Sequence, residues 1–93
     1  MDTLHIDESS ITIEFPCEYP VKVMGKNVAE FTEVILEIIR RHASDLKDEN
    51  ISLRPSRNNN YLAVNVIIYA TGTQQLQALF DDLKASGLVS MVL

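Results

Sequence analysis

The 93-residue sequence predicts an α+β domain in which two helices cover one face of a four-stranded antiparallel sheet. Apolar residues recur at helical spacing in two segments, and they alternate with polar residues at strand spacing in four others. In chain order these segments give strand, helix, strand, strand, helix and strand. Hydrophobic residues make up 46% of the chain and charged residues 23%, which is typical of a globular domain that folds alone.

The first strand and helix are predicted from residues 19–24 and 28–42. The first segment alternates in the manner of a strand, and Gly25 is expected to end it. Asn27 is placed to cap the following helix, with Glu30 three residues later to complete a capping box. The helix carries one broad apolar stripe, which has to be buried.

The second and third strands are predicted as a hairpin. Residues 51–54 alternate until Pro55 interrupts the ladder, and the three asparagines at 58–60 favour a turn because asparagine tolerates left-handed backbone angles. Residues 61–70 show the longest alternation in the chain. We therefore expect this strand to lie in the centre of the sheet.

The second helix follows this strand, and a short strand at 89–93 closes the chain. Thr73 is placed to cap the helix, apolar residues recur between 76 and 83, and Gly87 supplies a left-handed stop. Two strand–helix–strand units require right-handed crossovers, so both helices fall on one face of the sheet. The predicted architecture is a ferredoxin-like βαββαβ sandwich.

One domain is expected over residues 15–93. Residues 1–14 form a lead-in that is either flexible or adds an edge strand, since their alternation is weak. The start of the chain has neither the basic stretch nor the apolar run of a signal peptide, and no apolar run is long enough to span a membrane. We therefore expect a cytoplasmic protein without membrane contact.

Charge and cysteine content exclude several classes of function. The net charge is −5, which disfavours nucleic acid as a partner because phosphate binding needs a basic surface. An RNA-recognition module shares the element order, but its third strand needs aromatic residues two apart, and here Tyr61 is followed by Ala63 and Asn65. A single cysteine and two separate histidines predict neither a metal site nor a cofactor.

No catalytic constellation emerges from the sequence. Cys17 has no histidine near it in the chain and is expected to be a small packing residue. His42 ends the first helix, where we expect it to pack or to cap the terminal carbonyls. Asp81 and Asp82 are expected on a solvated helix face. The sequence therefore predicts a protein that is not an enzyme.

The face of the sheet that the helices leave uncovered is the first candidate site. The two-residue period places apolar residues on it among polar ones, and a contiguous apolar patch usually marks contact with another protein. The alternative is that single apolar residues are ordinary on a surface. The expected interface residues are Met24, Arg54, Tyr61, Ile67, Tyr69 and Val92, and the residues expected to face the core are Val21, Val23, Ile51, Leu53, Leu62, Val64, Val66, Ile68, Val89, Met91 and Leu93.

The turn after the first strand is the second candidate site. Gly25, Lys26 and Asn27 place backbone N–H groups, the positive end of a helix and a lysine together, which favours a small anion. The alternative is that Gly25 only permits the turn and Asn27 only caps the helix.

A combination of short strings resembles one known family. They are Phe15-Pro16, Tyr19, Val21-Lys22-Val23-Met24-Gly25, Arg40-Arg41-His42-Ala43, Pro55-Ser56, Asn60-Tyr61 and the terminal Met91-Val92-Leu93. Together they resemble the YbeD-like family of small bacterial proteins, whose biochemical role is unassigned, over residues 15–93. The resemblance implies an ACT-like fold, similar to regulatory domains of amino-acid-metabolising enzymes, and it does not indicate which activity the protein has. It also implies small effectors near the first strand–helix turn, at the positions of Gly25 and Asn27.

The leading hypothesis is a non-catalytic regulatory or interaction module that forms a homo-oligomer, expected to be a dimer, and binds a small anionic effector. Its rival is a monomeric adaptor in which Arg54, Arg57 and Tyr61 contact another protein. A phosphate-handling enzyme at the Gly25 turn is a third alternative.

Overall fold

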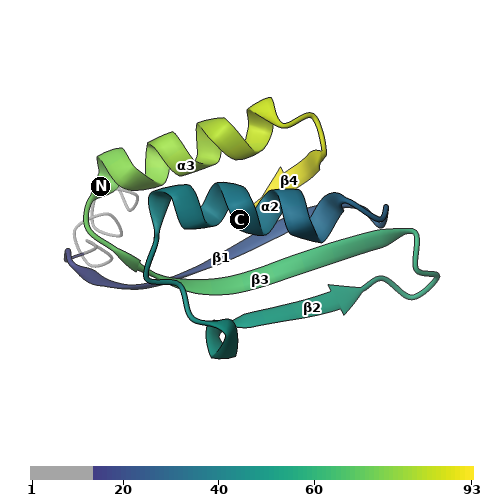
Figure 1. Ribbon diagram of the computed structural model, residues 1–93, viewed down its shortest axis with the longest axis horizontal. Helices are drawn as coiled ribbons and strands as arrows, with labels where there is room; N and C mark the ends of the chain where they lie inside the picture. Colours follow the sequence, from purple (N-terminus) through teal and green to yellow (C-terminus); the bar gives the residue numbers. More distant parts are fainter. Residues whose placement is uncertain (1–13) are drawn as a thin grey trace, which may run out of the picture.

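The computed structural model describes residues 14–93 and confirms the predicted order of elements (Figure 1). The expected lead-in at residues 1–14 lies outside the described residues except for Glu14. The elements are β1 (Cys17–Lys26), α2 (Phe31–His42), a short 3-10 helix η1 (Asp48–Asn50), β2 (Ile51–Pro55), β3 (Tyr61–Ala70), α3 (Thr73–Ala85) and β4 (Val89–Val92).

The four strands form one antiparallel sheet in the order β2-β3-β1-β4. β1 and β3 pair along their whole lengths, from Cys17 opposite Ala70 to Lys26 opposite Tyr61. Both helices lie on the same side of this sheet (Figure 1). This arrangement is the ferredoxin-like sandwich that the sequence predicts, with β3 in the centre as expected.

The core lies between the helices and the sheet. The predicted apolar stripes are buried there, because each helix has to hide its apolar side against another element. The most deeply buried side chains are those of Val23, Phe31, Ile35, Ile39, Val64, Val66, Ile68, Leu79 and Leu83. None of the helices described in residues 14–93 is long and apolar enough to cross a membrane.

Gly25 does not end β1, as the sequence analysis expected, but continues it. It is buried and pairs with Leu62 of β3 and Val89 of β4. A Cβ atom at this position would collide with the carbonyl oxygen of Leu88 and the ring of Phe31. The glycine is therefore required because a helix residue and a neighbouring backbone approach β1 closely at this point.

The predicted capping box is also wrong, because α2 begins later than expected. Its N-cap is Glu30, and no side chain makes a capping hydrogen bond there. The Asn27 amide instead donates to the carbonyl of Asn59 at 3.1 Å, and the Asn27 backbone N–H donates to the carbonyl of Asn60 at 3.0 Å. Asn27 thus ties the end of β1 to the β2–β3 turn, where Asn59 has the left-handed conformation predicted for this turn.

The start of α3 differs from the prediction, whereas its end agrees with it. Thr73 is the first helical residue and not the cap, which is Gly72. The side chain of Gln75 reaches back and accepts a hydrogen bond of 2.7 Å from the backbone N–H of Thr71. At the other end Gly87 has a φ of 79°, which confirms the predicted left-handed stop.

β4 contains a register irregularity that reverses the predicted faces at its end. Gly25 pairs with Val89 but Met24 pairs with Met91, so β4 places two residues where β1 advances by one. Val92 therefore turns toward the core, and Met91 and Leu93 are exposed. The expectation that Val92 lies on the uncovered face, and that Met91 and Leu93 face the core, is wrong.

Leu53 is a further correction to the predicted core. It lies opposite Val64 on the helix side of the sheet, as the alternation predicts, but it is 49% exposed. β2 is an edge strand, and the helices do not cover this part of it.

We predict that Gly25→Ala lowers the free energy of unfolding by roughly 1–3 kcal/mol, because the added methyl group has to displace Phe31 or the backbone at Leu88. Gly72→Ala is the matched control, since its φ of 171° is extended and nothing lies within 4 Å of the new Cβ. Urea denaturation measures both. Equal stability of the two variants would contradict the close approach at Gly25.

Candidate functional site

The main candidate site is the face of the sheet opposite the helices, which we call the open face. The strand pairing places its residues in rows, of which the middle one contains Ser52, Asn65 and Lys22. The open face consists of Glu18, Pro20, Lys22, Met24, Lys26, Ser52, Arg54, Tyr61, Ala63, Asn65, Ile67, Tyr69 and Met91. Five of the six predicted interface residues are among them, and Val92 is not.

Large apolar side chains are exposed over this face. Tyr61, Ile67, Tyr69, Met91 and the adjoining Leu93 are between 42% and 66% exposed. When one face of an antiparallel sheet is exposed only to water, the residues on that face are usually polar. The alternation of residues 89–93 predicts that Met91 faces the core. The pairing of Met24 with Met91 places it on the open face instead.

Charged side chains divide the open face into two ends. Lys26 and Arg54 lie toward the end that carries Tyr61, while Glu18 lies beside Tyr69 at the other end. Glu49 adds a second carboxylate near that end, just before β2. The face therefore has a basic end and an acidic end, although the whole chain is acidic.

A hollow of about 440 Å³ crosses the middle of the open face. Its polar lining includes Lys22, Ser52 and Asn65, and its apolar lining includes Ile67 and Leu93. Leu93 is held there by two backbone hydrogen bonds with Lys22, of 2.9 and 3.0 Å. Sites for small molecules commonly have this size and this mixture of apolar walls with a few polar groups.

The turn at Gly25, Lys26 and Asn27 differs from the predicted anion site. Gly25 is buried, and the backbone N–H groups of Asn27 and Val28 donate to the carbonyls of Asn60 and Lys26. Lys26 is exposed and lines a hollow of about 310 Å³. Of the three residues expected to hold an anion, Gly25 is buried, whereas Lys26 and Asn27 are exposed.

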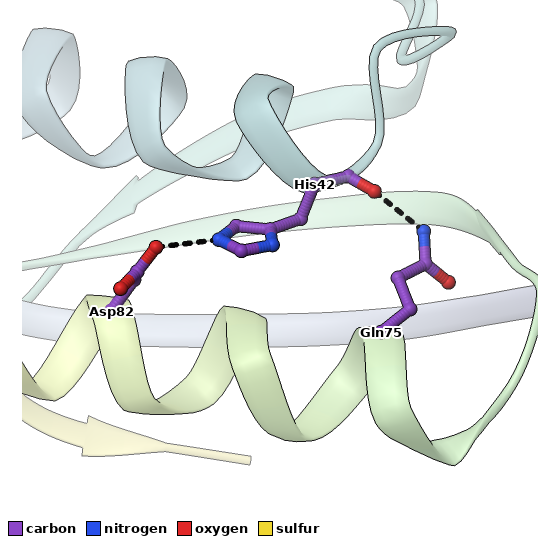
Figure 2. A network of polar contacts seen from close by, with 3 residues as sticks. All are labelled: His42, Gln75 and Asp82. Carbon is purple, nitrogen blue, oxygen red and sulfur yellow. Dashed lines mark hydrogen bonds and ion pairs between the residues drawn. The ribbon is translucent and has the colours of Figure 1, made fainter.

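A second polar cluster joins the two helices on the other side of the molecule (Figure 2). His42 Nε2 lies 2.6 Å from a carboxylate oxygen of Asp82 in α3. Gln75 donates from its side-chain amide to the backbone carbonyl of His42, also at 2.6 Å. The terminal carbonyl of α2 is therefore capped by Gln75. Of the two roles expected for His42, its ring packs partly buried between the helices, and the Asp82 carboxylate that it meets stays 45% exposed.

The contacts of this cluster join α2 to α3. A histidine with a carboxylate needs a nucleophile on its other side to perform acyl transfer. Figure 2 shows that the ring of His42 points at Asp82 and that the backbone carbonyl of His42 accepts a hydrogen bond from Gln75. Cys17 is half-buried in β1 and packs against the core, and residues 14–93 contain no cluster of side chains that could hold a metal ion.

Comparison with known proteins identifies the family. The model of the family "Protein of unknown function (DUF493)" matches residues 11–93. A UPF0250 protein of Azotobacter vinelandii is 50% identical over 88 residues, which cover 94% of this chain and 96% of that protein. A UPF0250 protein of Nitrosomonas europaea is 40% identical over 81 residues, covering 87% and 93%. The expected likeness to small uncharacterised bacterial proteins is confirmed.

Comparison with solved structures confirms the ACT-like fold. The ACT domain from a GTP pyrophosphokinase of Chlorobium tepidum has a TM-score of 0.64 at 20% identity, covering 83% of this chain and 97% of that one. Protein HP0495 from H. pylori has a TM-score of 0.67 at 18% identity, covering 88% and 86%. At these identities the likeness concerns the fold alone.

We predict that Asp82→Ala is less stable than Asp81→Ala by about 0.5–1 kcal/mol, because Asp82 contacts a side chain of the other helix whereas Asp81 contacts one of its own helix. Asp81 accepts a hydrogen bond from Gln77 in its own helix, at 2.9 Å. Both variants gain the same helix propensity and each loses one side-chain contact, so the difference between their urea midpoints reports how much more the contact with His42 contributes than the exposed contact with Gln77. Equal midpoints would show that the contact with His42 adds no more stability than the exposed contact within α3.

Proposed function

Because the chain belongs to the DUF493 family of proteins of unknown function and has an ACT-like fold, we propose that it is a non-catalytic regulatory module that self-associates through the open face of its sheet. The observation that carries this proposal is the group of large apolar side chains exposed on that face. A second copy would remove them from water, which is the main favourable term in protein association.

The composition of the open face supports contact with protein. Tyrosine and methionine are enriched at interfaces, whereas lysine and glutamate are depleted there. The aromatic and thioether side chains extend over three strands, with Tyr61 and Tyr69 on β3, Met24 on β1 and Met91 on β4. Lys26, Glu18 and Arg54 lie near the ends of the face, as expected for a polar rim.

A small anionic effector remains part of the proposal. The site first expected for it, at Gly25, Lys26 and Asn27, stays a prediction that depends on Lys26, since hydrogen bonds already occupy the backbone N–H groups of Asn27 and Val28. The exposed Lys26 and Glu30 both line the hollow at this turn, so an anion bound there would contact Lys26 and stay away from the carboxylate of Glu30.

The adaptor hypothesis makes a different use of the same surface. Arg54 and Tyr61 lie on the open face, and Arg57 lies in the neighbouring turn. An adaptor would present these residues to another protein and would stay monomeric at every concentration. Measuring the mass of the purified protein therefore separates the two hypotheses before any partner is sought.

We predict that the wild-type protein forms a dimer in a concentration-dependent manner and that Tyr69→Asp prevents it. A carboxylate within an apolar contact has to be desolvated without a partner, which costs roughly 2 kcal/mol or more. Light scattering across a concentration series, or sedimentation equilibrium, measures the effect. Ile67→Asp should act in the same way.

Leu53→Asp is the control for this prediction. Leu53 is as exposed as Tyr69, at 49% against 48%, but it lies on the helix side of the sheet. This variant should dimerise like the wild type. A monomeric wild type, or dimers that survive Tyr69→Asp and Ile67→Asp, would contradict self-association through the open face.

A further inference from the structure

We propose that the self-associated form encloses a small doubly charged oxyanion between the Lys22 side chains of two copies, whose open faces pack together with their strands antiparallel. This inference rests on the proposed self-association and adds its geometry and a ligand class. It starts from the rows of the open face and from the hollow at their centre.

The open face is nearly self-complementary about its middle row. Two residues from Lys22 in either direction lie Met24 and Pro20 on β1, and four residues away lie Lys26 and Glu18. A two-fold axis in the plane of the contact, along the middle row, exchanges the two ends of each strand. A contact built on such an axis is isologous, so each matched pair occurs twice.

This axis brings opposite charges together at both ends. Lys26 comes to lie over Glu18 of the second copy, since the two residues are equally far from the middle row on the same strand. On the β2 side, Arg54 comes to lie toward Glu49 of the second copy, because these residues flank Ser52 on opposite sides. The arrangement with parallel strands would instead oppose like charges, which is destabilising.

The same axis matches large side chains with small ones on β3. Ile67 lies two residues from Asn65 in one direction and Ala63 lies two residues away in the other. The bulky side chain of each copy therefore faces a small one of the other, and Tyr61 meets Tyr69 at the ends. Alternation of large and small residues across a contact allows close packing.

Lys22 is the exception to this complementarity, because it lies on the middle row and meets Lys22 of the second copy. Two ammonium groups withdrawn from water without a partner are costly. Within residues 14–93 the structure records no carboxylate paired with Lys22. An anion between the two lysines would remove the repulsion and supply the missing hydrogen-bond acceptors.

The hollow around Lys22 has the chemistry to receive such an anion. The hydroxyl of Ser52 and the amide of Asn65 line it beside the lysine, so each copy offers three side-chain groups that donate hydrogen bonds. Glu49 also lines the hollow, at the β2 side, and the geometry above brings Arg54 of the second copy to it. The walls at Pro20, Ile67 and Leu93 favour a ligand whose charged group carries an apolar body.

The area of the open face explains why an anion should control assembly. The strands β1, β3, β2 and β4 are 10, 10, 5 and 4 residues long. With a spacing of about 4.8 Å and a rise of about 3.3 Å per residue they make a face of roughly 460 Å², less than the ~800 Å² per partner of a standard stable interface. The dimer is therefore expected to be weak without a ligand. An anion that binds the dimer alone raises its apparent stability by mass action.

The orientation of the two copies is tested by exchanging charges. Lys26→Glu should weaken the dimer, and adding Glu18→Lys to the same chain should restore it. Within one chain these residues are about 26 Å apart, so they cannot compensate each other except between copies. If the double variant is no better than Lys26→Glu, the antiparallel arrangement is wrong.

The anion is tested by sedimentation equilibrium in sodium chloride, sodium phosphate and sodium succinate at equal ionic strength. The account expects phosphate, succinate or both to strengthen the wild-type dimer about tenfold, within the usual range of coupling between two sites. Comparison of the two anions shows whether a phosphate or a carboxylate group is preferred. Lys22→Met should dimerise at least as well as the wild type in chloride and should not respond to either anion.

Lys84→Met controls for a general effect of removing an exposed lysine, because Lys84 lies in α3 and not on the open face, and it should keep the response to anion. A wild-type dimer that forms in chloride, is disrupted by Tyr69→Asp and ignores both anions would overturn the anion site but leave the proposed function intact. A response that persists in Lys22→Met would also overturn it. A monomer in all three salts would overturn the proposed function itself.

Discussion

The structure depends on the close approach at Gly25, where β1 meets Phe31 of α2 and the backbone at Leu88 before β4. A side chain at this position would separate the first helix from the sheet and the last strand from its neighbour. The register irregularity of β4 occurs at the same place, between Met24 and Gly25. The packing of α2 and the orientation of β4 therefore have one common origin.

The composition of the open face follows from that irregularity. Because β4 shifts by one residue, Met91 joins Met24 on the uncovered side of the sheet and Val92 packs against the core. With both helices on one side, the other face keeps large apolar side chains exposed. The cost of hydrating this surface is the physical reason to expect a partner, and the separation of charge between its ends favours a second copy of the chain.

Local patterns in the sequence predicted the fold and the central part of the site. The alternation of residues 61–70 correctly assigned Tyr61, Ile67 and Tyr69 to the open face, since β3 is regular along its length. The errors at Asn27, Met91 and Val92, among others, concern residues whose positions depend on contacts with distant parts of the chain. Asn27 bonds to the turn at 59–60, and the faces of β4 depend on the packing around Gly25. The alternation of residues within one segment does not reveal a bulge or a contact with a distant turn.

The most direct test of the central claim is an NMR measurement on a mixture of isotope-labelled and unlabelled protein, which detects contacts between copies alone. The account predicts contacts between the ring of Tyr61 in one copy and the ring of Tyr69 in the other, with Ile67 of one copy near Ala63 of the other. Contacts between copies that arise from α2, α3 or the edge of β2, with none from these open-face residues, would contradict it.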